Sequence, residues 1–157
     1  PKVGDRMRIA VCSDEPYAFH NEVVAKLEKE GHEVVCFGSF KSGDEESWPL
    51  VARAAAEAIA CGDCEEGVFF CWTGTGVSMA ANKVPGIRAA LCCDPETARG
   101  ARVWNHANVL VLSNRLMTPA RAIEILQEWL DSPRRDPLGD VGVQELTAID
   151  MRYRRMQ

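Results

Sequence analysis

The chain has 157 residues, 46% hydrophobic and 26% charged, with a net charge of −5. This composition predicts one folded domain rather than a disordered chain, and the acidic balance argues against a nucleic-acid surface. No stretch of about 18 apolar residues occurs, so we expect no membrane span. Seven cysteines, an odd number lying mostly in apolar runs, indicate reduced thiols and a cytoplasmic protein rather than a disulfide framework.

Short apolar runs alternate with helical patterns along the whole chain. The runs predict five strands, at 8–12, 33–37, 67–71, 87–93 and 109–112. The helical patterns lie at 19–30, 48–60, 77–82, 95–104, 118–130 and 143–155, with a polar loop at 38–47. Asp94 and Thr118, each followed by proline, are typical helix N-caps. The unbroken apolar run at 67–71 indicates a strand buried on both faces. Residues 1–7 show no signal-peptide pattern, and Met7 is an alternative start that would make the first six residues a leader.

This alternation predicts a doubly wound, five-stranded parallel α/β sheet in three layers. We expect an α/β domain at 7–130 and a C-terminal arm and helix at 131–157 that reaches a partner subunit. Ligands of such sheets bind beyond the carboxyl ends of the strands. Polar or reactive groups follow three strands, at Ser13–Asp14, at Cys71 and at 113–115, and we expect them to meet on one edge.

The most informative stretch is CWTGTGVSMAANK at 71–83, in which a strand, a Thr-Gly-Thr-Gly loop and a short helix follow one another. Gly74 and Gly76 are only half of a dinucleotide fingerprint, because Met79 holds the third glycine position. No P-loop Gly-Lys-Ser/Thr follows either. What remains is a tight turn whose N–H groups point at a ligand oxygen. Cys71 beside it is either a base or nucleophile, or simply a buried strand cysteine.

Cys61 and Cys64 have the CxxC spacing found in zinc and redox sites. The three histidines are scattered and supply no second ligand pair, so a turn at a helix end is the simpler interpretation.

The motif Cys71-x-Thr-Gly-x-Gly-Val-Ser78, followed by AANKVPGIR at 80–88, resembles the family of type B ribose-5-phosphate isomerase and galactose-6-phosphate isomerase. The resemblance covers about residues 8–130 and is supported by Asp14, Asn105, Asn108 and Arg115. It implies a flavodoxin-like sheet and a homodimer or tetramer with its active site at the subunit interface. It also implies aldose–ketose isomerisation of a sugar or sugar phosphate through an enediol, without a metal or organic cofactor.

The resemblance also implies roles for individual residues. Cys71 is the base, Thr73 handles hydroxyl protons, and the loop N–H groups stabilise oxyanion charge. The implied substrate-binding residues are Asp14, Glu15, Trp72, Gly74, Thr75, Gly76, Val77, Ser78, Trp104, Asn105 and Arg115.

Three features depart from the family pattern. Glu15 stands where a histidine normally follows Asp14, and Trp104 stands where a ring-opening histidine normally precedes Asn105. His106 replaces that histidine only if the local turn differs. The stretch 138–144 lacks the phosphate-binding arginines, and bidentate arginine contacts supply much of phosphate recognition. These departures predict a divergent isomerase whose substrate is an unphosphorylated or otherwise unusual aldose or ketose.

Two other functions stay open from the sequence. The first is a non-catalytic protein that binds a sugar or sugar phosphate, because loss of the ring-opening acid would end catalysis. The second is a nucleotide-binding regulator with a nucleotide at the glycine loop, but the incomplete dinucleotide fingerprint argues against it.

Overall fold

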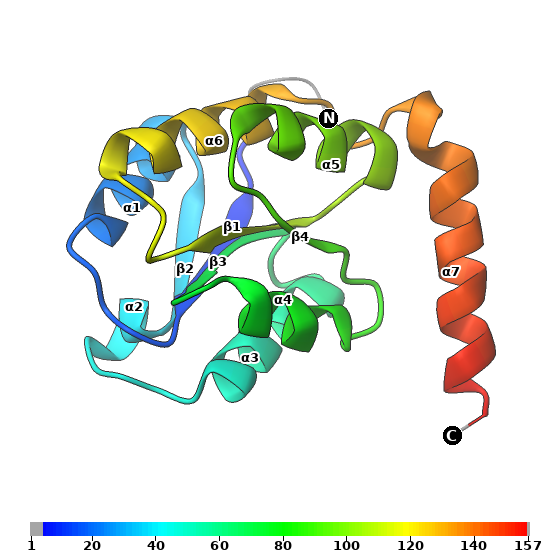
Figure 1. The fold of residues 1–157 in the computed structure, drawn as a ribbon, viewed down its shortest axis with the longest axis horizontal. Coiled ribbons are helices and arrows are strands. Elements are labelled where there is room, and N and C mark those ends of the chain that lie inside the picture. Colours follow the sequence, from blue (N-terminus) through cyan, green and yellow to red (C-terminus); the bar gives the residue numbers. More distant parts are fainter. Residues whose placement is uncertain (1–4, 157) are drawn as a thin grey trace.

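The computed structural model describes residues 5–156, so the expected leader at 1–6 falls largely outside the described residues. The chain forms a layered α/β unit with one helix standing at its side (Figure 1). In chain order its elements are β1 Arg8–Ser13, α1 His20–Lys29, β2 Glu33–Gly38, α2 Ser39–Ser42, α3 Trp48–Ala60, β3 Glu66–Cys71, α4 Thr75–Asn82, β4 Ala89–Leu91, α5 Pro95–Asn105, β5 Val109–Ser113, α6 Pro119–Asp131, a 3-10 turn Pro137–Gly139 and α7 Asp140–Arg154.

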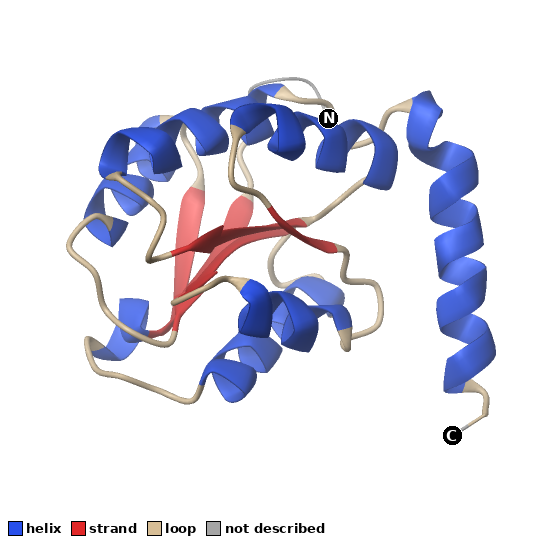
Figure 2. Ribbon diagram, viewed as in Figure 1, coloured by secondary structure: helices blue, strands red, loops and turns tan. Residues whose placement is uncertain are grey.

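All five strands are parallel, in the order β2-β1-β3-β5-β4. Right-handed crossovers put helices on opposite faces when the chain steps in opposite directions along the sheet. Helices α1, α5 and α6 therefore share one face and α3 and α4 the other, with the strands as a layer between them (Figure 2). The predicted doubly wound sheet is confirmed. It differs from the flavodoxin order 2-1-3-4-5 in that β5 lies between β3 and β4.

Each face of the sheet has its own hydrophobic core. Toward α1, α5 and α6 the core includes Phe70, Leu112 and Trp129. Toward α3 and α4 it includes Phe69 and the buried residues that recur at helical spacing along α3: Val51, Ala52, Ala55, Ala56 and Ile59. All six residues of β3 are buried, which confirms the prediction of a strand covered on both faces. Burying each large apolar side chain contributes about 1.5–3 kcal/mol, so the central strand, which ends at Cys71, is firmly held.

The predicted starts of α5 and α6 are confirmed by their caps. The Asp94 carboxylate accepts a hydrogen bond from the Thr97 N–H at 2.7 Å, and the Thr118 hydroxyl accepts one from the Arg121 N–H at 3.2 Å. Other boundaries differ from the sequence pattern. The expected loop at 38–47 contains α2, and α4 and α7 begin two and three residues earlier than predicted. Strand β4 is shorter than predicted, because the Arg88 N–H donates to the Asn108 side chain at 2.8 Å rather than to a strand.

One buried carboxylate attaches the C-terminal arm to the amino edge of the sheet. Glu66 is 1% exposed and lies 2.9 Å from Arg102, 2.6 Å from Arg134 and 2.9 Å from the indole N–H of Trp129. The Arg102 guanidinium also lies over the Trp129 ring, 4.3 Å from its centroid. Beyond this anchor, α7 packs against α5 and buries none of its residues. Its contact with a partner subunit stays a prediction.

The CxxC stretch is a turn at a helix end. Cys61 follows the last residue of α3 and is exposed, Cys64 is buried, and both thiols are free. Within residues 5–156 no group of three or more His, Cys, Asp or Glu side chains is placed to hold a metal ion. The helices of that part of the chain are all too short or too polar to cross a membrane.

Candidate active site

Cys71 is the last residue of the central strand, β3, at the carboxyl edge of the sheet. Its side chain is 5% exposed and borders the core under α3 and α4. Cys12 of β1 lies in the same core and is fully buried. Burial raises the pKa of Cys12 well above its ordinary value, and the nearby Cys71 and Asp14 raise it further. Cys12 is therefore a neutral, inaccessible thiol, which leaves Cys71 as the thiol at the carboxyl edge of these two strands.

The turn after Cys71 leaves backbone donors free. Within the described residues, the N–H groups of Trp72, Thr73 and Gly74 have no hydrogen-bond acceptor. Gly74 has φ 79°, and a Cβ on it would lie 2.5 Å from Leu91, so only glycine fits this turn. Helix α4 begins at the next residue and adds the positive end of its dipole. The turn therefore presents several donors to one small oxygen-rich ligand.

The side chains of the loop divide into exposed and supporting groups. The hydroxyls of Thr73 and Thr75 are exposed and lie 2.7 Å apart, so each can give a proton to the other. Val77 is buried in the core, and Ser78 is half-buried with its N–H donated to the Gly74 carbonyl at 3.2 Å. Val77 and Ser78 therefore hold the loop in place, whereas the hydroxyls of the two threonines are open to solvent.

The three polar strand ends meet on one edge, as the sequence predicts. The Asn114 N–H donates to the Cys71 carbonyl at 2.9 Å, and the Arg115 N–H donates to the Trp72 carbonyl at 3.1 Å. The Ser113 hydroxyl donates to that same Trp72 carbonyl at 2.9 Å. These bonds tie the end of β5 to the loop after β3.

A buried histidine supports this edge, and sequence reasoning missed it. The His20 Nε2 lies 2.8 Å from the side-chain oxygen Oδ1 of Asn114, so its N–H donates to that oxygen. The Asn114 amide donates to the Ser13 hydroxyl at 3.2 Å, and Ser13 donates to the Glu15 carbonyl at 2.8 Å. Burial lowers the pKa of His20, which keeps the imidazole neutral, and its ring stacks on Phe40 with centroids 4.5 Å apart. His20 stands on a helix with no neighbouring motif, so no sequence signal marks it.

Two carboxylates follow β1 at the same edge. One oxygen of Asp14, Oδ1, is buried without a hydrogen-bond partner among the described residues. Burial raises the pKa of Asp14, and the neighbouring Glu15 and Glu45 raise it further. Glu15 accepts a hydrogen bond from the Tyr17 hydroxyl at 2.8 Å. An unpaired buried oxygen costs about 1–3 kcal/mol, and a hydroxyl of a bound sugar would satisfy it.

Aromatic side chains flank the loop. Trp72 is 53% exposed, and Trp48 at the start of α3 lies 3.0 Å from the position that a Cβ on Gly76 would take. Gly76 therefore lets the Trp48 ring lie against the first turn of α4. Arg115 is exposed just beyond β5.

Trp104 and Asn105 lie at the opposite edge of the same chain. Helix α5 starts at the carboxyl edge after β4 and ends at the amino edge before β5, about 16 Å away for its 11 residues. The Asn105 carbonyl accepts from Arg88, which precedes β4, and the Trp104 ring lies on Gly100. Within one chain, these two predicted site residues therefore lie at the other edge of the sheet from Cys71.

His106 does not take up the position of a free acid beside Trp104. The local turn does differ, since His106 has φ 45°. Its side chain is buried against the arm, where Nε2 lies 2.8 Å from the Asp136 carbonyl and would be 2.6 Å from a Cβ on Gly139. His106 therefore fastens the arm to the end of α5.

Comparison with known proteins decides the family. A model of the Ribose/Galactose Isomerase family matches residues 9–139, including the whole of the cysteine loop. The chain belongs to this family. Ribose-5-phosphate isomerase B of Escherichia coli is 34% identical over 141 residues, 90% of this chain and 94% of that protein. D-erythrulose-4-phosphate isomerase of Pectobacterium atrosepticum is 38% identical over 112 residues, 71% of this chain and 74% of that protein.

The structures of the Ribose/Galactose Isomerase family agree with this fold. A ribose-5-phosphate isomerase B of Clostridium thermocellum superposes with a TM-score of 0.87 at 36% identity, covering 94% of this chain and 99% of that one. The type B enzyme of Leishmania infantum gives a TM-score of 0.86 at 32% identity, covering 95% and 99%. The predicted family resemblance is confirmed, and with it the prediction of an aldose–ketose isomerase.

Proposed function

We propose that Cys71 is the base of this isomerase and that the loop after it holds the reacting oxygens. The observation that carries the proposal is the position of the thiol. Cys71 ends the central strand, and the unbonded N–H groups of Trp72, Thr73 and Gly74 follow it directly. Each donor aimed at a developing oxyanion is worth about 3 kcal/mol of transition-state stabilisation.

The residues present account for the protons that move between C1 and C2 of the open-chain sugar. The Cys71 thiolate takes the proton from C2 of the aldose, which leaves an enediolate and a neutral thiol. The O2 proton passes to O1 through the Thr73 hydroxyl, with Thr75 within hydrogen-bond distance of it. The thiol then returns its proton to C1, which gives the ketose and restores the thiolate. Asp14 holds a substrate hydroxyl through its unpaired oxygen.

Asp14→Asn tests this binding role. We expect the variant to melt about 1–3 °C higher than wild type at neutral pH, since it removes a half-buried charge that Glu15 and Glu45 repel. Because folding raises the pKa of Asp14, the penalty is full above that pKa and disappears as pH falls toward 3.8. The gain in melting temperature should therefore shrink with acidification, as calorimetry from pH 8 to pH 4 would measure.

The same Asp14→Asn variant should bind substrate at least about tenfold more weakly, because a hydrogen bond to a charged group is worth about 1.5–3 kcal/mol. Glu22→Gln on the exposed side of α1 is the control and should change neither quantity. Unchanged substrate affinity in the Asp14→Asn variant would show that Asp14 does not bind the substrate.

The carboxyl edge suits a sugar that carries no phosphate at this position. Asp14 and Glu15 stand there with Glu45 close enough to act on Asp14, and their charges repel a dianion. Arg115 is exposed at the same edge. The Escherichia coli relative is named for ribose 5-phosphate and the Pectobacterium relative for erythrulose 4-phosphate, so sugar phosphates define the broader substrate class to be tested.

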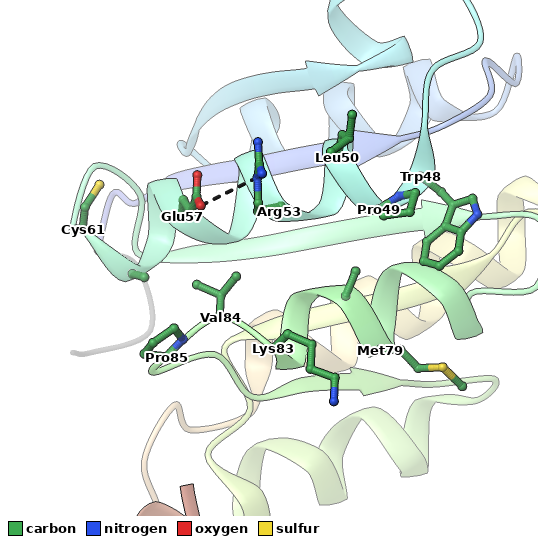
Figure 3. A pocket seen from close by; sticks show the side chains of 12 residues that line it. Trp48, Pro49, Leu50, Arg53, Glu57, Cys61, Met79, Lys83, Val84 and Pro85 are labelled. Carbon is green, nitrogen blue, oxygen red and sulfur yellow. Dashed lines mark ion pairs between the residues drawn. The ribbon is translucent and has the colours of Figure 1, made fainter. Parts of the chain in front are cut away.

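We also propose a homodimer with its active site at the subunit interface. Trp104 and Asn105 lie at the amino edge, so only a second copy brings them to Cys71. A groove of about 940 Å³ between α3 and α4 offers the contact surface (Figure 3). Apolar side chains dominate it, from Trp48, Leu50 and Met79 to Val84 and Pro85.

Two further observations favour a second copy as the occupant of the groove. Trp48 lines the groove and lies against Gly76, so the groove is continuous with the catalytic loop. Helix α7 of the same chain exposes Leu146, Ile149 and Tyr153, which provides a second apolar surface for such a contact. In this proposal residues 7–130 carry the loop and residues 131–157 form an arm for the partner.

Met79→Glu tests the dimer. Met79 is 65% exposed on the groove, and burying a carboxylate there costs several kcal/mol. The dimer dissociation constant should rise at least about 100-fold by analytical ultracentrifugation, with turnover lost in parallel. Lys29→Glu, on the opposite face of the sheet, should leave both unchanged. A Met79→Glu variant that stays dimeric would place the interface elsewhere.

The proposed reaction is tested by proton exchange in heavy water, followed by NMR. Ribose 5-phosphate, erythrulose 4-phosphate and free pentoses and hexoses are each incubated with the enzyme. We expect deuterium at C1 or C2 of at least one free sugar, since the enediol exchanges its carbon proton with solvent. Saturable sugar binding without any exchange would contradict the isomerase mechanism and favour the sugar-binding alternative.

A further inference from the structure

A cationic pocket lies at the amino edge of the sheet, at the opposite end of β3 from Cys71. It has a volume of about 420 Å³ and four of its lining residues are arginines: Arg88, Arg102, Arg134 and Arg135. Two carboxylates are close by. Glu66 forms ion pairs with both Arg102 and Arg134. The Glu65 carboxylate accepts a hydrogen bond from the backbone N–H of Arg8 at 2.6 Å. A third carboxylate, that of Asp140, lies 3.8 Å from the lining residue His106.

Arg88 and Arg135 are the two arginines of this pocket that have no ion-pair partner among the described residues. Within the described residues neither lies within 4.0 Å of a carboxylate oxygen. Burial lowers the pKa of Arg88 and the positive charge of Arg135 lowers it further, so the two cations are close enough to repel each other. Arg88 is half-buried and Arg135 is exposed. An anion that enters between these two like charges lowers their repulsion and so stabilises the structure.

Arg88 is already fixed in a geometry that leaves its terminal nitrogens available. Its Nε donates to the carbonyls of Asn105 at 3.2 Å and His106 at 2.9 Å. Its backbone N–H donates to Asn108. The two Nη groups make no hydrogen bond to another described residue. A guanidinium held by Nε alone presents a preorganised pair of donors, which lowers the entropic cost of binding.

We propose that Arg88 and Arg135, backed by Arg134, form a binding site for a phosphate-type dianion. Guanidinium forks match the oxygens of phosphate bidentately, and the polar, half-open pocket has room for an ion of this size. The site joins the β4 start to the C-terminal arm, so a bound dianion would fasten the arm to the sheet. The proposal does not depend on the chemistry of Cys71. The dianion is either a free phosphate-type ion or the phosphate group of a sugar whose reacting carbons reach the Cys71 of a partner.

The site is tested by titrating the full chain with inorganic phosphate at constant ionic strength, by calorimetry and thermal melting. We expect saturable binding and a melting temperature that rises by several degrees. Arg135→Gln is exposed and outside the Glu66 cluster, so it should fold normally and weaken phosphate binding at least tenfold. Arg88→Gln should do the same. Arg53→Gln on α3 and Arg115→Gln at the Cys71 edge are matched controls and should bind phosphate within twofold of wild type.

Two outcomes would overturn the proposal. One is a melting temperature that phosphate raises no more than chloride does. The other is loss of phosphate binding in Arg115→Gln with binding kept in Arg135→Gln, which would place the anion at the Cys71 edge.

The kinetics of proton exchange identify the source of the dianion. If Arg135→Gln raises KM for ribose 5-phosphate and leaves free sugars unchanged, the site holds the sugar's own phosphate, whereas unchanged KM for both identifies a free ion. Phosphate binding is measured equally well in Cys71→Ala, so failure of the isomerase mechanism does not affect the test.

Discussion

Cys71→Ala is expected to lower the rate of isomerisation about 1,000-fold or more while sugar affinity stays within about tenfold of wild type. Removing a positioned general base typically costs 10²- to 10⁴-fold, and no other thiol can substitute. Cys12 is the nearest candidate, but it is fully buried and its pKa is raised well above the ordinary value. The measurement is deuterium incorporation at C1 and C2 together with steady-state turnover.

Cys93→Ala is the matched control for this prediction. Cys93 is an exposed free cysteine after β4, outside the loop at 71–78, and its removal should leave turnover unchanged. Comparable activity in Cys71→Ala and Cys93→Ala would assign the base to another group. Binding lost in Cys71→Ala together with turnover would instead mean that the thiol supports the loop rather than the proton transfer.

Arg102→Ala is expected to lower the free energy of unfolding by about 3–5 kcal/mol, the cost of breaking a buried ion pair. Arg102 is fully buried, and its guanidinium bonds Glu66, the Trp129 carbonyl at 3.2 Å and the Ala107 carbonyl at 3.1 Å. Without it, Glu66 keeps Arg134 but loses its second cation inside the core. Chemical denaturation should show the loss, with a melting temperature about 10 °C lower.

Arg99→Ala is the control on the same helix. Arg99 pairs with Glu96 at 2.7 Å on the surface of α5, where solvent screens the interaction, so stability should hardly change. A loss in Arg102→Ala no larger than the loss in Arg99→Ala would show that water replaces the missing guanidinium. Glu66→Ala should destabilise the protein as strongly as Arg102→Ala, because it leaves two arginines without their shared carboxylate.

The local structure of the loop at 71–78 could be predicted from the sequence because it lies in contiguous residues. The apolar run at 67–71 specifies a buried strand, and the glycines at 74 and 76 specify a tight turn. Asp94 and Thr118 are followed by proline, and both cap their helices as predicted. The meeting of Asp14, Cys71 and Asn114 on one edge follows from parallel strands alone.

Contacts between side chains on distant elements could not be predicted from the sequence. His20 is held by Asn114, 94 residues away, and nothing local marks either as a pair. Trp104 and Asn105 were grouped with Cys71 by resemblance, but α5 carries them to the opposite edge of their own chain. Glu66, Arg102 and Arg134 likewise come together only when the arm folds back.

The sequence by itself determined the alternating α/β order, the family and the cysteine loop, because periodicity, caps and a tight turn are properties of neighbouring residues. Only the tertiary structure decided that β5 lies between β3 and β4, that His106 fastens the arm, and that Arg88 and Arg135 face one pocket. These features depend on packing and charge between residues that are 20 or more positions apart, for which the chain carries no local signal.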